Sequence, residues 1–345
     1  MDPDYRPASP EYSYSERRRV RYDRRALFFT GNVLGLGLLG YLLMSLVYSM
    51  ILRTVPVMLD MYLNQPLYTY LFEIVYSYMC VGLPFLCVYA VLRRTRLYRD
   101  VRLPYGAPRH TGEAVALVPA ALAVCFLGSI ASNYLAAYAD AYGFGFLSYY
   151  EALEPDAVPE GLTGMVALTL RSALVPALLE EFAFRGVVLQ PLRKYGDWFA
   201  IVSSAVLFGM VHGTMMQLPF AIVAGVALGY CAVVTGSLRT GIAVHFLNNF
   251  VSVLVAIVSA RAGEGASVTV SNVAVYSVIV VGAVVLVAYL VRKPNALRLH
   301  PAAEPGLRAK GRALFLAPVL LIALAWLTWY ALNDISVFAE WLGVK

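Results

Sequence analysis

Two adjacent carboxylates and an arginine lie inside a stretch that otherwise has the composition of a membrane-spanning helix. They are Glu180, Glu181 and Arg185, within Leu-Val-Pro-Ala-Leu-Leu-Glu-Glu-Phe-Ala-Phe-Arg-Gly-Val-Val-Leu. One ionised side chain at the centre of a bilayer helix costs about 2.5–3.5 kcal/mol on insertion scales, so three close together need a reason. They indicate a functional site facing the interior of a helical bundle. The alternative is an internal ion pair that only joins two helices.

The composition supports a membrane protein. The chain has 345 residues, of which 60% are hydrophobic and 14% charged, and its mean hydropathy is +0.68. A soluble domain of this length needs more charge on its surface. Several apolar runs are as long as the roughly 20 residues needed to cross the hydrocarbon core. We therefore predict an all-α, polytopic transmembrane bundle that contacts the lipid bilayer.

The apolar runs divide the chain into eight or nine spans. Nine can be drawn, at about 27–52, 66–92, 114–136, 165–190, 198–214, 218–236, 240–260, 269–291 and 313–332. Pro84 and Pro176 are expected to kink the second and fourth of these. The predicted regions are a basic, disordered tail over 1–26, N-terminal helices over 27–160, a catalytic core over 165–260, and C-terminal helices over 261–345. The last helix follows a basic linker, and we expect it to be an appendage to the bundle.

The distribution of basic residues predicts the orientation. The tail and alternate connections (1–26, 93–113, 191–197, 237–239 and 292–312) hold 22 Lys and Arg, and the opposite set holds three. By the positive-inside rule, the N-terminus is cytoplasmic and the protein a multi-pass component of the cell membrane. The net charge of +6 is then a topology signal, and it gives no reason to expect a nucleic-acid partner.

Two histidines and an asparagine lie in the same apolar part of the chain. His212 ends the stretch Phe208-Gly-Met-Val-His212, and His245 begins His245-Phe-Leu-Asn-Asn249. Because residues four apart share a helix face, His245 and Asn249 should lie side by side, as should Glu181 and Arg185. A lone intramembrane histidine is often only a helix-bridging hydrogen-bond group. This concentration on three helices favours a chemical site.

Peptide hydrolysis is a reaction that would use this set. It needs an activated water, a stabiliser for the oxyanion and an acid for the leaving amine. If Arg185 pairs mainly with Glu181, then Glu180 is the candidate general base and the pair positions it. Asn249 has the amide donor of an oxyanion hole, and His212 and His245 can donate to the oxyanion or the leaving group. A glutamate with two histidines also matches a catalytic zinc. We expect no metal cofactor, because asparagine is an uncommon zinc ligand.

Three motifs in order resemble a known family. Glu180-Glu181-x-x-x-Arg185, Phe208-x-x-x-His212 and His245-x-x-x-Asn249 are similar to the motifs of the CAAX-protease and bacteriocin-processing family of intramembrane endopeptidases, also called the Abi or CAAX prenyl endopeptidase type. The resemblance covers about 165–260. It implies a helical membrane protease whose first glutamate activates water in a cavity lined by the histidines and the asparagine, and which opens toward the cytosol. Arg185 and Phe208 are then positioning residues. The substrate would be a peptide or a membrane protein.

One expectation follows from the need for these side chains to meet. His212 would otherwise lie at the far end of its helix, and 198–236 is short for two full crossings. We predict that these two helices are short or re-entrant and turn around Gly213–Pro219, which is tolerated beside a water-filled cavity. A proton-coupled transporter, or a scaffold that binds peptide or lipid without cutting it, remains an alternative function. The sequence defines neither the substrate nor the oligomeric state.

Overall fold

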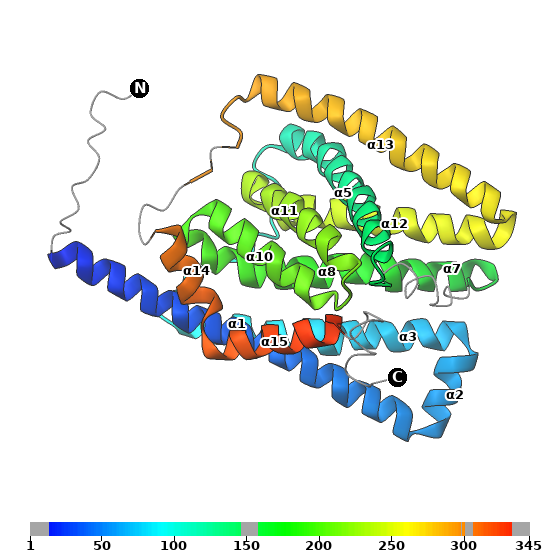
Figure 1. Cartoon of the computed structure of the whole chain (residues 1–345), viewed down its shortest axis with the longest axis horizontal. Helices are drawn as coiled ribbons and strands as arrows, with labels where there is room; N and C mark the ends of the chain where they lie inside the picture. Colours follow the sequence, from blue (N-terminus) through cyan, green and yellow to red (C-terminus); the bar gives the residue numbers. More distant parts are fainter. Residues whose placement is uncertain (1–13, 146–157, 298, 301–305, 333–345) are drawn as a thin grey trace.

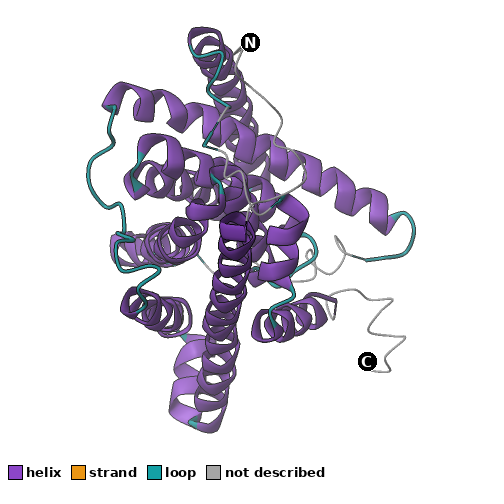
Figure 2. Cartoon of the chain, turned by 90° about the vertical axis from the view of Figure 1, so that its left-hand side faces the viewer, coloured by secondary structure: helices purple, strands orange, loops and turns teal. Residues whose placement is uncertain are grey.

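The protein is a bundle of helices. The computed structural model describes residues 14–145, 158–297, 299–300 and 306–332, and no strand occurs in these ranges. Figure 2, which views one end of the bundle, shows several of the helices end-on. Seven helical stretches are long and apolar enough to cross a membrane, and a bent pair brings the possible number within the described ranges to eight. The chain is therefore an all-α, multi-pass membrane protein, as predicted.

The N-terminal third forms a long hairpin. Helix α1 (Tyr14–Thr54) is followed by the short α2 (Pro56–Asn64), and α3 (Pro66–Tyr76), the π-helix η1 (Ser77–Gly82) and α4 (Leu83–Arg94) return beside it. The predicted kink at Pro84 takes the form of the π-helical stretch η1, which ends two residues before it. Proline has no N–H, so the regular hydrogen-bond ladder cannot continue through it.

The tail differs from the prediction. Residues from Tyr14 onward are helical and continuous with the first span, whereas the sequence predicted disorder through about residue 26. The segment is rich in arginine, which has a high helix propensity, and the apolar helix that follows extends readily backward into it. Residues 1–13 lie outside the described residues.

Helix α5 (Thr111–Asp140) is followed by the long helical stretch that carries the carboxylates. This stretch consists of α7 (Gly161–Thr169), η2 (Leu170–Leu174), α8 (Val175–Glu180), η3 (Glu181–Val188), α9 (Leu189–Leu192) and the 3₁₀ turn η4 (Arg193–Tyr195). The kink expected at Pro176 appears as the π-helix η2 just before it. A second π-helix, η3, begins at Glu181. π-Helical segments inside α-helices are frequent at functional sites.

Helices α10 (Asp197–Val211) and α11 (Gln217–Thr235) form the predicted hairpin within the bundle. The 15 residues of α10 extend only about 22 Å, less than the hydrocarbon thickness. Gly213 has φ +69° in the turn between the two helices, a conformation that glycine adopts without strain. The turn thus falls where it was expected. Among the described residues, seven helical stretches are long and apolar enough for a full crossing, or eight if the bent pair Leu307–Phe315 and Pro318–Leu332 is one span, and α10 is too short to be a ninth.

The last three spans close the bundle. Helix α12 (Leu238–Ala262) begins at Ser237, whose hydroxyl accepts a hydrogen bond from the backbone N–H of Arg239 as an N-cap. Helix α13 (Glu264–Arg292) packs along α5, and a Cβ placed on Gly282 would lie 2.2 Å from the Pro119 carbonyl oxygen. Glycine is therefore required at this contact.

The final helix is an integral part of the bundle, which corrects the expectation of an appendage. Helices α14 (Leu307–Phe315) and α15 (Pro318–Leu332) meet at an angle of 77°. Gly31 and Gly35 on α1 form a small-xxx-small pair, and a Cβ on Gly35 would lie 2.3 Å from the Leu320 nitrogen. The Asn32 side chain accepts a hydrogen bond from the backbone N–H of Val319 at 3.1 Å, at the bend itself.

The basic connections meet at one end of the bundle, the left-hand end in Figure 1. Arg109 N–H donates to the Thr235 carbonyl and Leu238 N–H to the Pro104 carbonyl, while Trp198 Nε1 donates to the Leu297 carbonyl. The connections 93–110 and 236–239 are thereby joined to each other, and the connection 293–300 is joined to the start of α10. Alternate connections along the chain thus lie at the same end of the bundle, as the distribution of Lys and Arg predicted. The cytoplasmic location of this end stays a prediction.

Candidate active site

Glu181 and Arg185 form a fully buried ion pair. Arg185 Nη1 lies 2.8 Å from Glu181 Oε1, and both side chains have zero exposure. The guanidinium also donates to the Gly225 carbonyl at 3.3 Å and lies 4.3 Å from the centre of the Phe208 ring. The arginine charge is thus neutralised by Glu181 and sheltered by an aromatic face. This is the pairing that the four-residue spacing predicted.

Glu181 is held from a third side by His245. The Nδ1 atom of His245 lies 3.1 Å from Glu181 Oε1, and its Nε2 atom lies 3.8 Å from Glu180 Oε2. Because a carboxylate only accepts hydrogen bonds, we assign the imidazole proton to Nδ1. The Nε2 atom then faces Glu180 across a gap that is too long for a direct hydrogen bond and that one water can bridge.

Room for Glu181 is provided by Gly241 on α12. A Cβ on this glycine would lie 2.7 Å from Glu181 Oε2. No hydrogen-bond partner for this oxygen occurs among the described residues. The absence of a side chain at Gly241 is therefore needed for the carboxylate to lie beneath His245.

His212 lies in the turn after α10. Its Nδ1 atom is 2.8 Å from the carbonyl oxygen of Phe208, so Nδ1 is again the protonated nitrogen, and Nε2 is free. The imidazole packs edge-on against the Phe208 ring, with 4.7 Å between ring centres, and His245 packs against the same ring at 5.9 Å. Phe208 thus contacts Arg185 and both histidines.

Asn249 is positioned by a carbonyl that Pro176 leaves free. In an α-helix the N–H of residue 176 would bond the carbonyl of Ser172, but proline has no N–H. The Asn249 Nδ2 atom donates to this carbonyl at 3.3 Å, and Asn248 Nδ2 donates to Asn249 Oδ1 at 3.1 Å. One of the two amide hydrogens of Asn249 remains available.

Five of the seven predicted residues line a common space, and the buried Glu181 and Arg185 lie outside it. A central cavity of about 410 Å³, including its open mouth, has in its wall Glu180, Phe208, His212, His245, Asn248 and Asn249. The carboxylate of Glu180 is partly accessible, with 23% side-chain exposure, and its Oε2 atom has no hydrogen-bond partner among the described residues. Unlike Glu181, Glu180 is not within ion-pair distance of Arg185. The two neighbouring glutamates are therefore in different environments.

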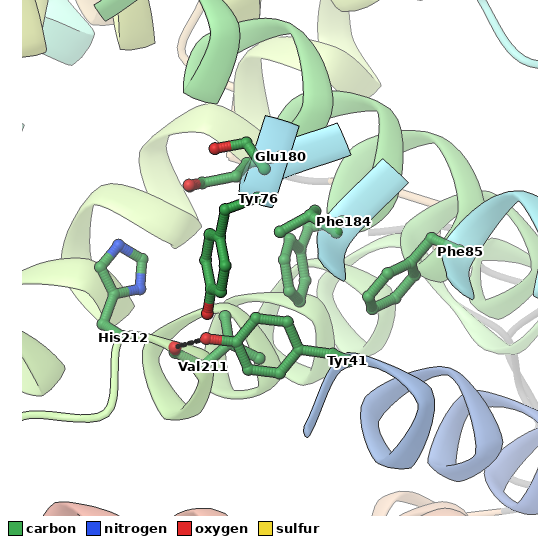
Figure 3. A pocket seen from close by; sticks show the side chains of 9 residues that line it. Tyr41, Tyr76, Phe85, Glu180, Phe184, Val211 and His212 are labelled. Carbon is green, nitrogen blue, oxygen red and sulfur yellow. Dashed lines mark hydrogen bonds between the residues drawn. The ribbon is translucent and has the colours of Figure 1, made fainter. Parts of the chain in front are cut away.

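A second cavity reaches Glu180 and His212 from the N-terminal hairpin. This tyrosine cavity is lined by Tyr41, Tyr76, Ser77, Val81, Phe85, Glu180, Phe184, Val211 and His212. In Figure 3 the side chains of Glu180, Tyr76 and His212 face the same space, and Tyr41 donates to the Val211 carbonyl at 3.3 Å. These tyrosines could not be predicted from the sequence, because α1 and α3 carry no motif and the contacts are long-range.

Glu73 on α3 and Arg171 on η2 are a second pair of charged residues within the apolar helices. Their side chains form an ion pair. Together with Tyr48, Tyr62 and Tyr76 they line a further cavity beside the tyrosine cavity. The two residues are far apart in the sequence, so no local sequence pattern could reveal this ion pair.

The geometry does not favour a metal centre. No group of three or more His, Cys, Asp and Glu side chains among the described residues is arranged to hold a metal ion. The hydrogen bonds of the two imidazoles do not bear on this point, because a histidine that binds a metal through Nε2 also donates from Nδ1 to a carbonyl or a carboxylate. The residues present do not fit a zinc ion as they stand, and metal independence stays a prediction.

Fold and site together describe a multi-pass membrane protein with a buried carboxylate–histidine centre, the class in which intramembrane hydrolases fall. Residues 162–251 match the family model described as Rce1-like, type II CAAX prenyl endopeptidase Rce1-like, which supports the resemblance to the CAAX-protease family. The matched segment is about a quarter of the chain and contains all seven predicted site residues. No curated protein and no solved structure matches the chain. Together with the apolar helices, the match supports a protease that works in the membrane.

Proposed function

We propose that the protein is an intramembrane endopeptidase in which Glu180 activates the attacking water without a metal ion. The observation that carries this proposal is the difference between the two glutamates. Glu181 is neutralised by Arg185, whereas Glu180 faces a cavity with an unpartnered oxygen. A carboxylate free of a cation, beside an imidazole nitrogen, is suited to accept a proton from water.

The gap between Glu180 and His245 defines where the water lies. A water between Glu180 Oε2 and His245 Nε2 bridges their 3.8 Å separation and satisfies both atoms. As the water oxygen attacks the carbonyl carbon of the substrate, one water proton passes to Glu180. The buried Glu181–Arg185 pair contributes by fixing the ring orientation of His245.

The remaining residues serve the tetrahedral intermediate. The free amide hydrogen of Asn249 is a donor for the oxyanion. His212 lines the same cavity, and its unprotonated Nε2 can accept a hydrogen bond from the N–H of the scissile peptide. When the carbon–nitrogen bond breaks, Glu180 returns its proton to the leaving amine. The carboxylate is then regenerated, and protons balance over the cycle.

The substrate is a peptide bond in a membrane-associated protein or peptide. The site lies within helices that meet the length and hydropathy of membrane spans, so a substrate must enter the bilayer or be anchored to it. The positive-inside count supports a cell-membrane protein with a cytoplasmic N-terminus. Nothing in the loops identifies a prenyl group, a leader peptide or a particular cleavage sequence.

The proposal is tested first through His245. We expect His245→Gln to lower kcat for a membrane-anchored model peptide by about 10²-fold or more, because the water loses its second contact. The measurement is peptide cleavage by the purified protein in lipid nanodiscs, followed by mass spectrometry. His110→Gln is the matched control, since His110 is exposed and precedes α5 at the basic end of the bundle. Equal rates for the parent and His245→Gln would contradict the proposal.

Metal independence has its own test. Cleavage should stay within about two-fold of the untreated rate after exposure to 1,10-phenanthroline or EDTA, because none of the proposed steps uses a Lewis acid. The rate is measured before and after removal of the chelator, with and without added zinc. Loss of cleavage that zinc restores would replace this mechanism by the metal-dependent one.

A further inference from the structure

A large cavity lined by uncharged polar side chains adjoins the central cavity. We call it the polar chamber, and its volume is about 1340 Å³ including its open mouth. Four helices contribute to it, and no Asp, Glu, Lys or Arg occurs among its described lining residues. The polar side chains beyond those of the central cavity are Ser129, Ser132, Asn133, Gln217, Ser252 and Ser271.

These six side chains share a second property. Among the described residues, none of their hydroxyl or amide groups has a protein hydrogen-bond partner. In the tyrosine cavity, by contrast, Tyr41 donates to a carbonyl and Tyr76 is hydrogen-bonded to Ser45 at 2.9 Å. A polar group left without a partner inside a bilayer costs several kcal/mol, so water is the partner that this lining requires. The absence of charges argues against an ion.

The polar chamber shares a wall with the central cavity. His212, Phe220, Asn248 and Asn249 line both spaces. Ser252 lies three residues beyond Asn249 on α12, on the same face and one turn farther from Glu180. A chain of polar groups therefore leads from the chamber to the candidate general base.

The chamber lies in the half of the bundle away from the basic connections. Helix α5 starts at the basic end, and Ser129, Ser132 and Asn133 are in its second half. Helix α13 ends at the basic end, and Ser271 is near its start. The chamber therefore lies farther from the basic connections than the site does.

We propose that the polar chamber is a water-filled passage that supplies the hydrolytic water to Glu180 from the end of the bundle opposite the basic connections. This inference rests on the proposed peptidase function. It adds a defined route for water, which is the second substrate of the hydrolysis. A glutamate enclosed by membrane helices needs such a route, because the hydrocarbon core contains almost no water.

The first test measures hydration directly. Ser252→Cys, in a Cys87→Ala background that removes the exposed native thiol, is compared with Leu254→Cys on the same helix. Leu254 is an exposed apolar residue outside the chamber. A charged, membrane-impermeant methanethiosulfonate should modify Ser252→Cys at least about 10-fold faster, because the reactive thiolate forms only where water reaches. Equal, slow modification of the two thiols overturns the passage.

The second test blocks the passage. Ser252→Phe should lower kcat by about 10-fold or more, because less water reaches Glu180. KM should stay within about two-fold, and Leu254→Phe should change neither parameter. A rise in KM with kcat unchanged would mean that peptide occupies the chamber, which overturns the proposal. If Ser252→Phe does not fold, Ser129→Phe with the control Leu127→Phe applies the same test from α5.

The two tests separate this inference from the proposed function. Thiol modification requires no catalysis. Slow modification of Ser252→Cys in a protein that cleaves peptide overturns the passage alone. Fast modification in a protein without peptidase activity overturns the proposed function and, with it, the role of the passage in hydrolysis.

Discussion

Glu180→Gln is expected to lower kcat for peptide cleavage by about 10²–10⁴-fold, the range typical of the loss of a general base. Glutamine keeps the size of the side chain but cannot take a proton from water. Glu180 is partly accessible and has no ion-pair contact with Arg185, so the fold should tolerate the change. The measurement is the initial rate of cleavage of a membrane-anchored peptide, with KM determined in parallel.

Glu113→Gln is the control for this variant. Glu113 is also a glutamate on a membrane helix, but it binds Lys293 at 2.8 Å and lines neither the central cavity nor the tyrosine cavity. Its substitution should leave kcat nearly unchanged. If Glu180→Gln cleaves as fast as the parent, Glu180 does not activate water, and the proposed mechanism fails.

Arg185→Met is expected to lower the free energy of unfolding by about 3–5 kcal/mol, because it leaves the Glu181 charge buried without its cation. Both side chains have zero exposure, so solvent cannot compensate. The measurement is the thermal unfolding midpoint in detergent, followed by tryptophan fluorescence. Lys194→Met is the control, because its 3.9 Å ion-pair contact with Asp23 is on the surface and such pairs contribute about 0–1 kcal/mol.

The double variant Glu181→Leu/Arg185→Met separates stability from activity. With both charges removed, no unpaired charge remains, and most of the lost stability should return. Peptide cleavage should not return, because His245 Nδ1 no longer has the carboxylate that orients the ring. A single Arg185→Met variant as stable as Lys194→Met would mean that the buried pair contributes little to the fold.

Much of the fold could be predicted because the membrane restricts the choices. Long apolar runs must be helical in lipid, and each of the nine predicted segments falls on a helix or a bent helix. The short α10 could be anticipated from the need to bring His212 to Glu180. The bend between α14 and α15 could not, because it depends on how Gly31, Gly35 and Asn32 of the distant α1 meet that segment.

The site was predictable where its contacts are local. Glu181 and Arg185 are four residues apart on one helix, and the motif order brought in Phe208, His212, His245 and Asn249. Their catalytic roles stay predictions. The contributions of Tyr41 and Tyr76, and the space that Gly241 leaves for Glu181, arise from packing between helices. Such contacts leave no period or spacing in a single sequence.

The packing of α15, the last described helix, against α1, the first, has a consequence for biosynthesis. Tyr41 on α1 forms part of the wall next to Glu180, and α1 is braced by α15 through Gly35; Tyr330 on α15 also touches Gly213, beside His212. Translation delivers α15 only after every other described helix has left the ribosome. A nascent chain that already contains all seven motif residues therefore still lacks this brace, and the wall beside Glu180 is complete only after α15 has been made.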